Sequence, residues 1–238
     1  MKYFWMFVGV LLVYILVSFA RVFLVYQLAD NPVVHQGFKI FGSGSRIRYM
    51  AAGDSTAVGE GASSVENTYT YKLGEALAHG NEVEYQNVAV IGATTDSFIK
   101  DQLQQIIDYK PDIVTISIGA NDRTHLKSNA DILANYKTII GELVEKTGAR
   151  IYITDIPSFE NASLLPMPFR SFLESRTRTL NPEIMALETS RVRVVDIHDF
   201  GWDNYPDITK TFAKDKFHPN DLGYENWTNA FLYKIQGH

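Results

Sequence analysis

The stretch Met50-Ala-Ala-Gly-Asp-Ser-Thr-Ala-Val-Gly59 organises the rest of the chain. The residues that lead into it predict a strand over 46–52, and small residues and glycines then form a tight turn. A strand that ends in such a turn can present the Ser55 hydroxyl above the edge of a sheet. If a helix follows, its free backbone N–H groups point at whatever that hydroxyl attacks. The stretch is thus a candidate nucleophile turn, although an ordinary Gly-Asp-Ser turn has the same letters.

The composition excludes several classes of protein. The 238 residues include 22 Lys and Arg against 27 Asp and Glu, a net charge of −5, and no basic cluster is interleaved with aromatic residues. Nucleic acid is therefore not an expected partner. The chain has no cysteine, which excludes disulfides, thiolate metal sites and cysteine nucleophiles. Its length suits one domain plus an appendage.

The N-terminus predicts a membrane segment. Residues 3–20 carry no charge and the apolar run resumes after Arg21, which is typical of a transmembrane helix. A cleaved signal peptide is the alternative, but the apolar run is long for one and Lys2 is the only early cation. The flanking charges do not decide orientation, and we expect a single-pass membrane protein whose domain faces away from the cytoplasm. The expected division is an anchor or uncleaved signal over 1–28, a linker over 29–45 and the folded domain over 46–238.

The remaining chain alternates strand-like and helix-like segments. The expected strands are 46–52, 83–91, 112–118, 150–155 and 192–197. Helical patterns lie between and after them, around 99–106, 132–144, 169–188 and 221–236, and Pro182 is expected to break or kink the third of these. Strands separated by helices imply a central parallel sheet of about five strands covered on both faces, a three-layer α/β/α fold.

The first three expected strands end in loops that carry reactive or hydrogen-bonding groups. In a parallel sheet these loops lie at the same edge. Ser55 can attack a carbonyl, and the Gly92 backbone N–H and the Asn121 side-chain amide can donate hydrogen bonds to an oxyanion. Each loop alone is a common turn, but the three together indicate acyl transfer.

Two histidines are candidates for the general base. Asp215 precedes His218 by three residues and can accept a hydrogen bond from its Nδ1–H, which fixes the tautomer and supports the imidazolium formed in catalysis. His198 follows the fifth expected strand and is a rival.

The motifs resemble those of the SGNH hydrolases, also called GDSL-type lipases and esterases. The resemblance covers about 45–238, and the matching blocks are Gly53-Asp54-Ser55, Gly92, Gly119-Ala-Asn121-Asp122 and Asp215-Lys-Phe-His218-Pro219. It implies a flavodoxin-like α/β/α fold, with Ser55 as nucleophile, His218 as base and Asp215 as orienting acid. The implied oxyanion donors are the backbone N–H groups of Ser55 and Gly92 and the side chain of Asn121. Asp54 matches a motif position but is expected to be structural.

The expected function is that of a serine esterase acting on an acyl lipid or an O-acylated glycan or envelope polymer, through an acyl-enzyme and without a metal or organic cofactor. An acyltransferase with the same triad and a catalytically silent binding domain are the alternatives. The segment 157–172, which includes Leu164-Leu-Pro-Met-Pro-Phe169, follows the fourth expected strand. It is expected either to form an apolar wall or lid for an acyl group, or to pack on the domain or the bilayer.

Overall fold

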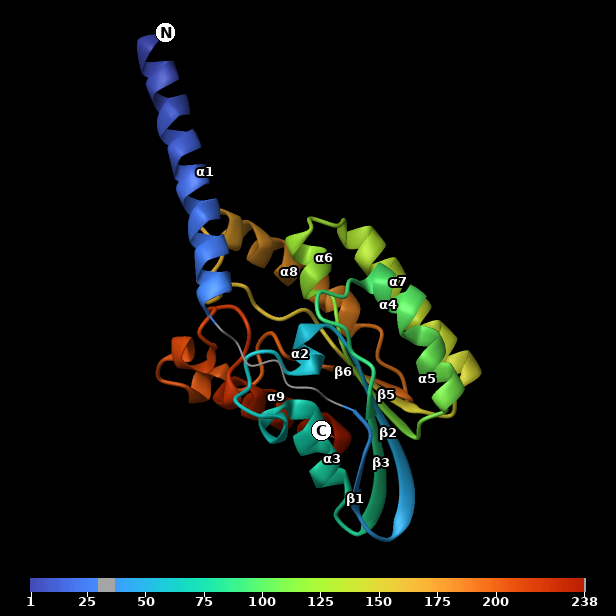
Figure 1. The fold of residues 1–238 in the computed structure, drawn as a ribbon. Coiled ribbons are helices and arrows are strands. Elements are labelled where there is room, and N and C mark those ends of the chain that lie inside the picture. Colours follow the sequence, from blue (N-terminus) through green and yellow to red (C-terminus); the bar gives the residue numbers. More distant parts are fainter. Residues whose placement is uncertain (30–36, 238) are drawn as a thin grey trace.

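The fold was obtained as a computed structural model that describes residues 1–29 and 37–237. A single sheet has the strand order β1-β3-β2-β4-β5-β6 (Figure 1). Neighbouring strands are parallel except at one edge, where β1 and β3 are antiparallel. The strands are β1 (Lys39–Gly42), β2 (Ser45–Gly53), β3 (Asn81–Asn87), β4 (Ile113–Ser117), β5 (Arg150–Thr154) and β6 (Val192–Val195).

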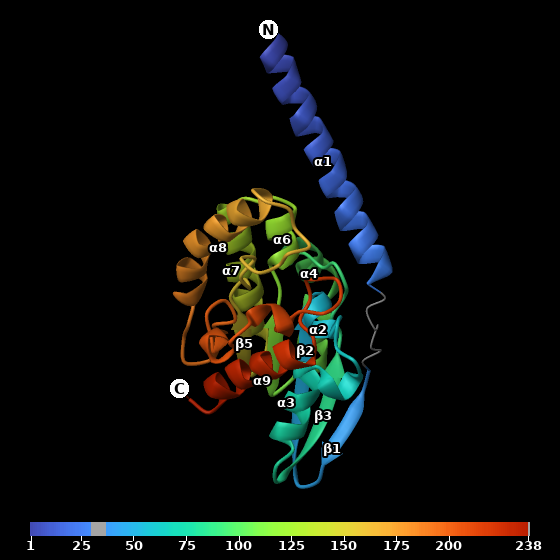
Figure 2. The ribbon, with the colours of Figure 1, turned by 90° about the vertical axis from the view of Figure 1, so that its left-hand side faces the viewer.

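Helices cover both faces of this sheet. One face is covered by α3 and α9 and the other by α4, α5, α7 and α8, as two perpendicular views show (Figures 1 and 2). The three-layer α/β/α prediction is therefore confirmed. The helices are α1 (Lys2–Leu28), α2 (Ser55–Val58), α3 (Tyr69–Leu77), α4 (Thr95–Asp101), α5 (Leu103–Tyr109), α6 (Ala120–Thr124), α7 (Asn129–Lys146), α8 (Phe169–Met185) and α9 (Asp221–Ile235), with short 3-10 turns η1 (Val65–Asn67), η2 (Trp202–Asn204) and η3 (Ile208–Thr211).

The strands supply both halves of the core because successive side chains point to opposite faces. In β2, Met50 and Ala52 belong to the cluster under α4, α5, α7 and α8, whereas Tyr49 and Ala51 belong to the cluster under α3 and α9. All four are almost fully buried. A strand buried on both faces has a continuous apolar pattern, which is what the sequence has here.

The sheet contains one strand more than expected. Strand β1 lies inside the range 29–45 that the sequence predicts as a linker, and it pairs with β3. Phe41 explains this pairing, because its buried ring packs against Tyr71 and Tyr85. The part of the expected linker from 30 to 36 lies outside the described residues.

Two helical expectations are corrected. The expected helix around 99–106 is divided into α4 and α5 at Gln102, whose buried amide bonds to the backbone of Gly53. Helix α8 is not broken at Pro182 but continues to Met185. Pro182 removes one hydrogen bond from the helix, yet the fully buried side chains of Leu180 and Ile184 on either side hold the last turn against the core.

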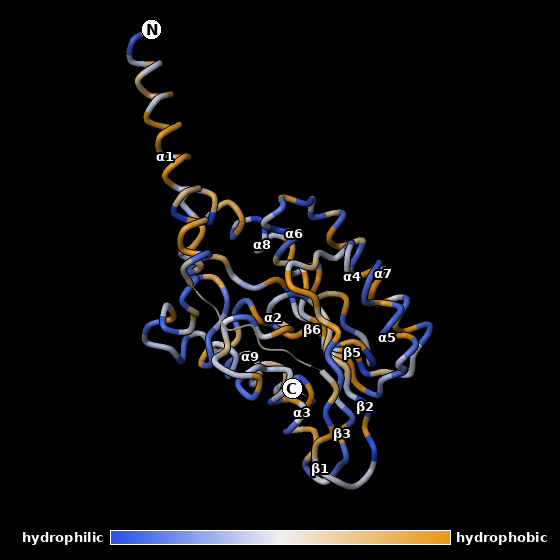
Figure 3. The backbone as a smooth tube through the Cα atoms, viewed as in Figure 1, coloured by the Kyte–Doolittle hydropathy of each residue, from blue (hydrophilic) through white to orange (hydrophobic). Residues whose placement is uncertain are grey.

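Helix α1 has the length and composition of a membrane span. The segment Lys2–Gln27 has a mean hydropathy of 2.5 in its most apolar window, and nearly all its large apolar side chains are exposed. It leaves the domain as a long apolar rod (Figure 3). The same properties fit a signal sequence, so the helix agrees with both alternatives drawn from the sequence.

Candidate active site

Ser55 lies where the strand order reverses. After β2 the chain adds β3 on one side of it and then β4 on the other, and such a switch point at the carboxyl ends of parallel strands is where α/β sheets form their sites. Ser55 is the first residue of α2, and the Asp54 side chain caps this helix by accepting a hydrogen bond from the Thr56 N–H at 2.9 Å. Burial is the main reason why the pKa of Asp54 rises to about 6. Asp54 therefore has a structural place in the turn.

The turn before Ser55 requires a glycine. Gly53 has φ of +134°, and a Cβ at this position would lie 1.9 Å from the carbonyl oxygen of Ser117 on β4. The sequence gives no sign that Gln102 takes part, but its side chain accepts from the Gly53 N–H at 2.9 Å and donates to the Gly53 carbonyl at 2.8 Å. This clamp and the close strand fix the direction in which Ser55 leaves the sheet.

His218 joins Ser55 to Asp215. The Ser55 Oγ lies 2.9 Å from Nε2 of His218, and Nδ1 of the same ring lies 2.5 Å from Oδ2 of Asp215. The other Asp215 oxygen accepts from the backbone N–H groups of Phe217 and His218, so the loop itself holds the carboxylate in place. All three side chains of this relay are buried. Burial opposes the charged form of both members of the pair, but their mutual hydrogen bond outweighs it, lowering the pKa of Asp215 and raising that of His218.

Gly92 and Asn121 come to the same edge from the next two loops. Beyond the end of β3 the chain still follows β2, since the N–H of Val90 donates to the Gly53 carbonyl at 3.0 Å. This brings Gly92 alongside the Ser55 turn, with φ of +76° and open space where a side chain would stand. Asn121, in α6, donates one amide hydrogen to the Ala93 carbonyl at 3.0 Å. The amide carries two hydrogens, so the second can serve an oxyanion.

Glu60 is a site residue that the sequence analysis missed. It is buried, and its Oε2 lies 3.5 Å from Nε2 of His218 without a hydrogen-bond partner among the described residues. Its charge is a further cause of the raised His218 pKa, after the hydrogen bond to Asp215. Ligating atoms of Glu60, Asp215 and His218 all lie within 4.8 Å of one another, a spacing that could hold a metal ion. In the sequence only the position of Glu60 between Gly59 and Gly61, just after the nucleophile turn, marks it, and that signal is weak.

His198 is held by two carboxylates and cannot serve Ser55. Its Nε2 lies 3.0 Å from Glu174 on α8 and its Nδ1 lies 2.7 Å from Asp199. Burial would lower the pKa of His198, but the hydrogen bonds to these two acids raise it to about 9. Burial would raise the pKa of Glu174, but the hydrogen bond with His198 and those with Phe159 and Ser158 lower it to about 2. His198 thus connects the loop after β6 to α8 through its hydrogen bond to Glu174. The histidine beside Ser55 is His218, not its rival His198.

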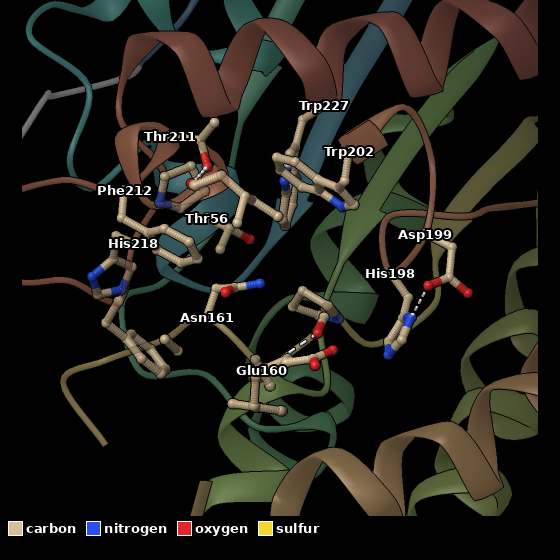
Figure 4. A pocket seen from close by; sticks show the side chains of 18 of the residues that line it. Thr56, Glu160, Asn161, His198, Asp199, Trp202, Thr211, Phe212, His218 and Trp227 are labelled. Carbon is tan, nitrogen blue, oxygen red and sulfur yellow. Dashed lines mark hydrogen bonds and ion pairs between the residues drawn. The ribbon is translucent and has the colours of Figure 1, made fainter. Parts of the chain in front are cut away.

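A cavity of about 360 Å³ opens beside His218. His218 and His198 stand at opposite sides of it (Figure 4). Its wall is partly aromatic and partly polar, and includes Trp202, Trp227, Phe159, Phe212, Asn161 and Asp203. Its size is at the lower end of the range for small-molecule sites. Residues 157–162, the start of the segment expected to form a wall or lid, line one side of it.

The fold is a three-layer α/β/α fold in which a serine contacts a histidine at the switch point of the central sheet. This combination is typical of a serine hydrolase. The chain belongs to the GDSL-like lipase/acylhydrolase family, whose model matches residues 51–225. No curated protein matches the chain. The fold is shared with the acetylxylan esterase Axe2 from Geobacillus stearothermophilus, at 19% identity and a TM-score of 0.60 over 82% of this chain and 96% of that one.

Two further solved structures share the fold. A lipase/acylhydrolase from Enterococcus faecalis has 21% identity and a TM-score of 0.61, covering 80% of this chain and 96% of its own. A lipolytic G-D-S-L family protein from Veillonella parvula has 14% identity and a TM-score of 0.64, covering 82% and 100%. The match to the family model confirms the expected family and enzyme class.

Proposed function

We propose that this enzyme hydrolyses carboxylic esters through an acyl-enzyme formed on Ser55. The proposal is carried by one observation, the line of contacts from the Ser55 Oγ through His218 to Asp215. His218 accepts the Ser55 proton as Oγ attacks the ester carbonyl. Asp215 holds the imidazole in the required tautomer and stabilises the imidazolium.

The negative charge of the tetrahedral intermediate falls on the carbonyl oxygen and is stabilised by three donors. These are the backbone N–H groups of Ser55 and Gly92 and the free amide hydrogen of Asn121. His218 then returns its proton to the leaving alcohol, and water attacks the acyl-enzyme with the same histidine as base.

For the substrate we propose an ester of an acyl lipid or of an O-acylated glycan, met outside the cytoplasm. The cavity beside His218 supports this class, since both aromatic side chains and polar groups line it. The neighbour named as an acetylxylan esterase acts on such an ester. Helix α1 is proposed as an uncleaved anchor that keeps the domain 46–238 at the membrane.

The test uses the Ser55→Ala variant and a fluorophosphonate probe that labels reactive serines. Labelling of the parent chain and its loss in Ser55→Ala, with turnover lowered on the order of a millionfold, would support the proposal. Near-normal turnover of the variant would refute it. A panel of acetyl, short-acyl, long-acyl and thioester substrates then identifies the ester, and product analysis with added alcohols separates hydrolysis from transfer to an acceptor.

A further inference from the structure

The middle of α1 contacts the domain. The Tyr14 hydroxyl donates to the carbonyl of Met167, and the Arg21 guanidinium donates to the carbonyl of Ser163 at 3.0 Å. A hollow of about 330 Å³ between the two is lined from the helix side by Tyr14, Val17, Ser18 and Arg21 and from the domain side by Ser163, Leu165, Pro166, Met167 and Arg170. The C-terminal half of α1 therefore lies beside the segment 163–170, and its N-terminal half extends away from the domain (Figures 1 and 2).

The charges of α1 indicate where a bilayer would lie. Lys2 and Arg21 are the only charged residues in the helix. They are 19 positions apart in the sequence, which is about 29 Å along the helix at 1.5 Å per residue. This is close to the hydrocarbon thickness of about 30 Å. Placing both cations at the interfaces puts Tyr14 about 10 Å inside the hydrocarbon edge on the domain's side. The segment that contacts Tyr14 must then reach the same depth.

The segment has the composition for such a place. Between Glu160 and Glu174 the only charged residue is Arg170. Met167 and Phe172 are each 48% exposed, so the segment presents large apolar side chains outward, as a membrane-interaction site does. Arg21 on the helix and Arg170 within the segment both line the hollow, and their guanidinium groups suit the phosphate groups of lipid headgroups.

We propose that the segment Ser163–Phe172, which we call the immersed segment, enters the leaflet of the lipid bilayer on the domain's side, next to α1. The inference rests on the proposal that α1 is a membrane anchor. It divides the two expectations between two parts of the segment 157–172: residues 157–162 line the cavity, whereas the exposed side chains of 163–172 meet lipid.

The immersed segment is joined to the catalytic loop. The N–H of Leu164, which is buried, donates to the carbonyl of Lys216 at 3.2 Å, and Lys216 lies between Asp215 and His218 in the sequence. The loop that carries the proposed base is thus held at the surface of the bilayer. An ester located at the lipid–water boundary can then reach the site while it stays at that boundary.

The absence of cysteine allows a direct test. Single cysteines are introduced in the full chain at Met167→Cys and Ser171→Cys in the immersed segment, at Leu12→Cys in the middle of α1, and at Ser43→Cys in the exposed β1–β2 turn, at the far end of the domain (Figure 1). Each is labelled with an environment-sensitive fluorophore and reconstituted in phosphatidylcholine–phosphatidylglycerol vesicles, with and without nitroxide-labelled lipid. Esterase activity of each labelled protein verifies its fold, and intact mass verifies that α1 is retained. Ser171 provides a second position because its Oγ lies 3.3 Å from the sulfur of Met167.

The expected result is blue-shifted fluorescence and quenching by nitroxide lipid at Met167, Ser171 and Leu12, with neither at Ser43. Quenching at Leu12 without quenching at Met167 and Ser171 would overturn the inference and leave the anchor intact. Absence of quenching at all four positions would refute the anchor, and the inference with it. Neither result bears on the ester chemistry, which is followed separately by the serine probe.

Discussion

The Asn121→Ala substitution tests the oxyanion site most directly. Its amide has two hydrogens, one of which is donated to the Ala93 carbonyl at 3.0 Å. The other is the one we assign to the oxyanion. Loss of an oxyanion donor costs about 2.7–4 kcal/mol of transition-state stabilisation, so kcat should fall by about a hundred- to a thousandfold. KM should change little, because this hydrogen bond strengthens only as charge develops.

The structural contribution of Asn121 has to be separated from this effect. Loss of the hydrogen bond to Ala93 should lower the free energy of unfolding by about 1 kcal/mol, which leaves the protein folded. Asn81→Ala is the matched control, because the Asn81 amide also donates to a backbone carbonyl, that of Leu77 at 3.0 Å, at the opposite end of the sheet. It should show the stability loss without the loss of kcat.

The assay is steady-state hydrolysis of the best ester from the substrate panel, together with urea unfolding of each variant. A fall in kcat of less than tenfold for Asn121→Ala would refute the reasoning. So would an effect confined to KM, which would mean that Asn121 binds the ground-state substrate.

Three further predictions concern the base, its titration and the anchor. His218→Ala should abolish turnover. His198→Ala should keep activity per folded molecule but lose about 1.5–3 kcal/mol of stability, because it removes one charge-assisted hydrogen bond from Glu174, which keeps its ion pair with Arg178. Equal loss of activity in both variants would contradict the assignment of His218 as the base. His218 must be neutral to act as a base, and its pKa is raised above the ordinary 6.5, so kcat/KM should fall as the pH drops through that raised pKa. Glu60→Gln should move this acidic limb of the pH profile to lower pH. An acidic limb that stays in place would contradict an effect of the Glu60 charge on His218. Protease added to intact spheroplasts should degrade the domain, and protection until the membrane is opened would place it in the cytoplasm.

The order and type of most elements follow from local patterns. Apolar runs at the sheet centre predict the buried strands, and the spacing of apolar residues predicts α7 and α9 within a few residues of their ends. The three strand-end loops with Ser55, Gly92 and Asn121 are visible as well, because a parallel sheet gathers its loops at one edge. The spacing of Asp215 and His218 allows a pair, and the resemblance of this block to that of the SGNH hydrolases is what identifies it.

The tertiary structure decided what depends on contacts between distant residues. A short segment such as β1 becomes a strand only because β3 offers it a free edge for pairing. The same pairing buries the Phe41 side chain of β1. The sequence already favoured His218 over His198 as the base, but the partners that hold His198 lie on α8 and in the following residue, where no spacing rule points. Only the glycines on either side mark Glu60 in the sequence, and its charge matters because the chain folds it against His218. Local sequence patterns report the conformation of a segment, whereas the pKa and the role of a buried group depend on what long-range packing places beside it.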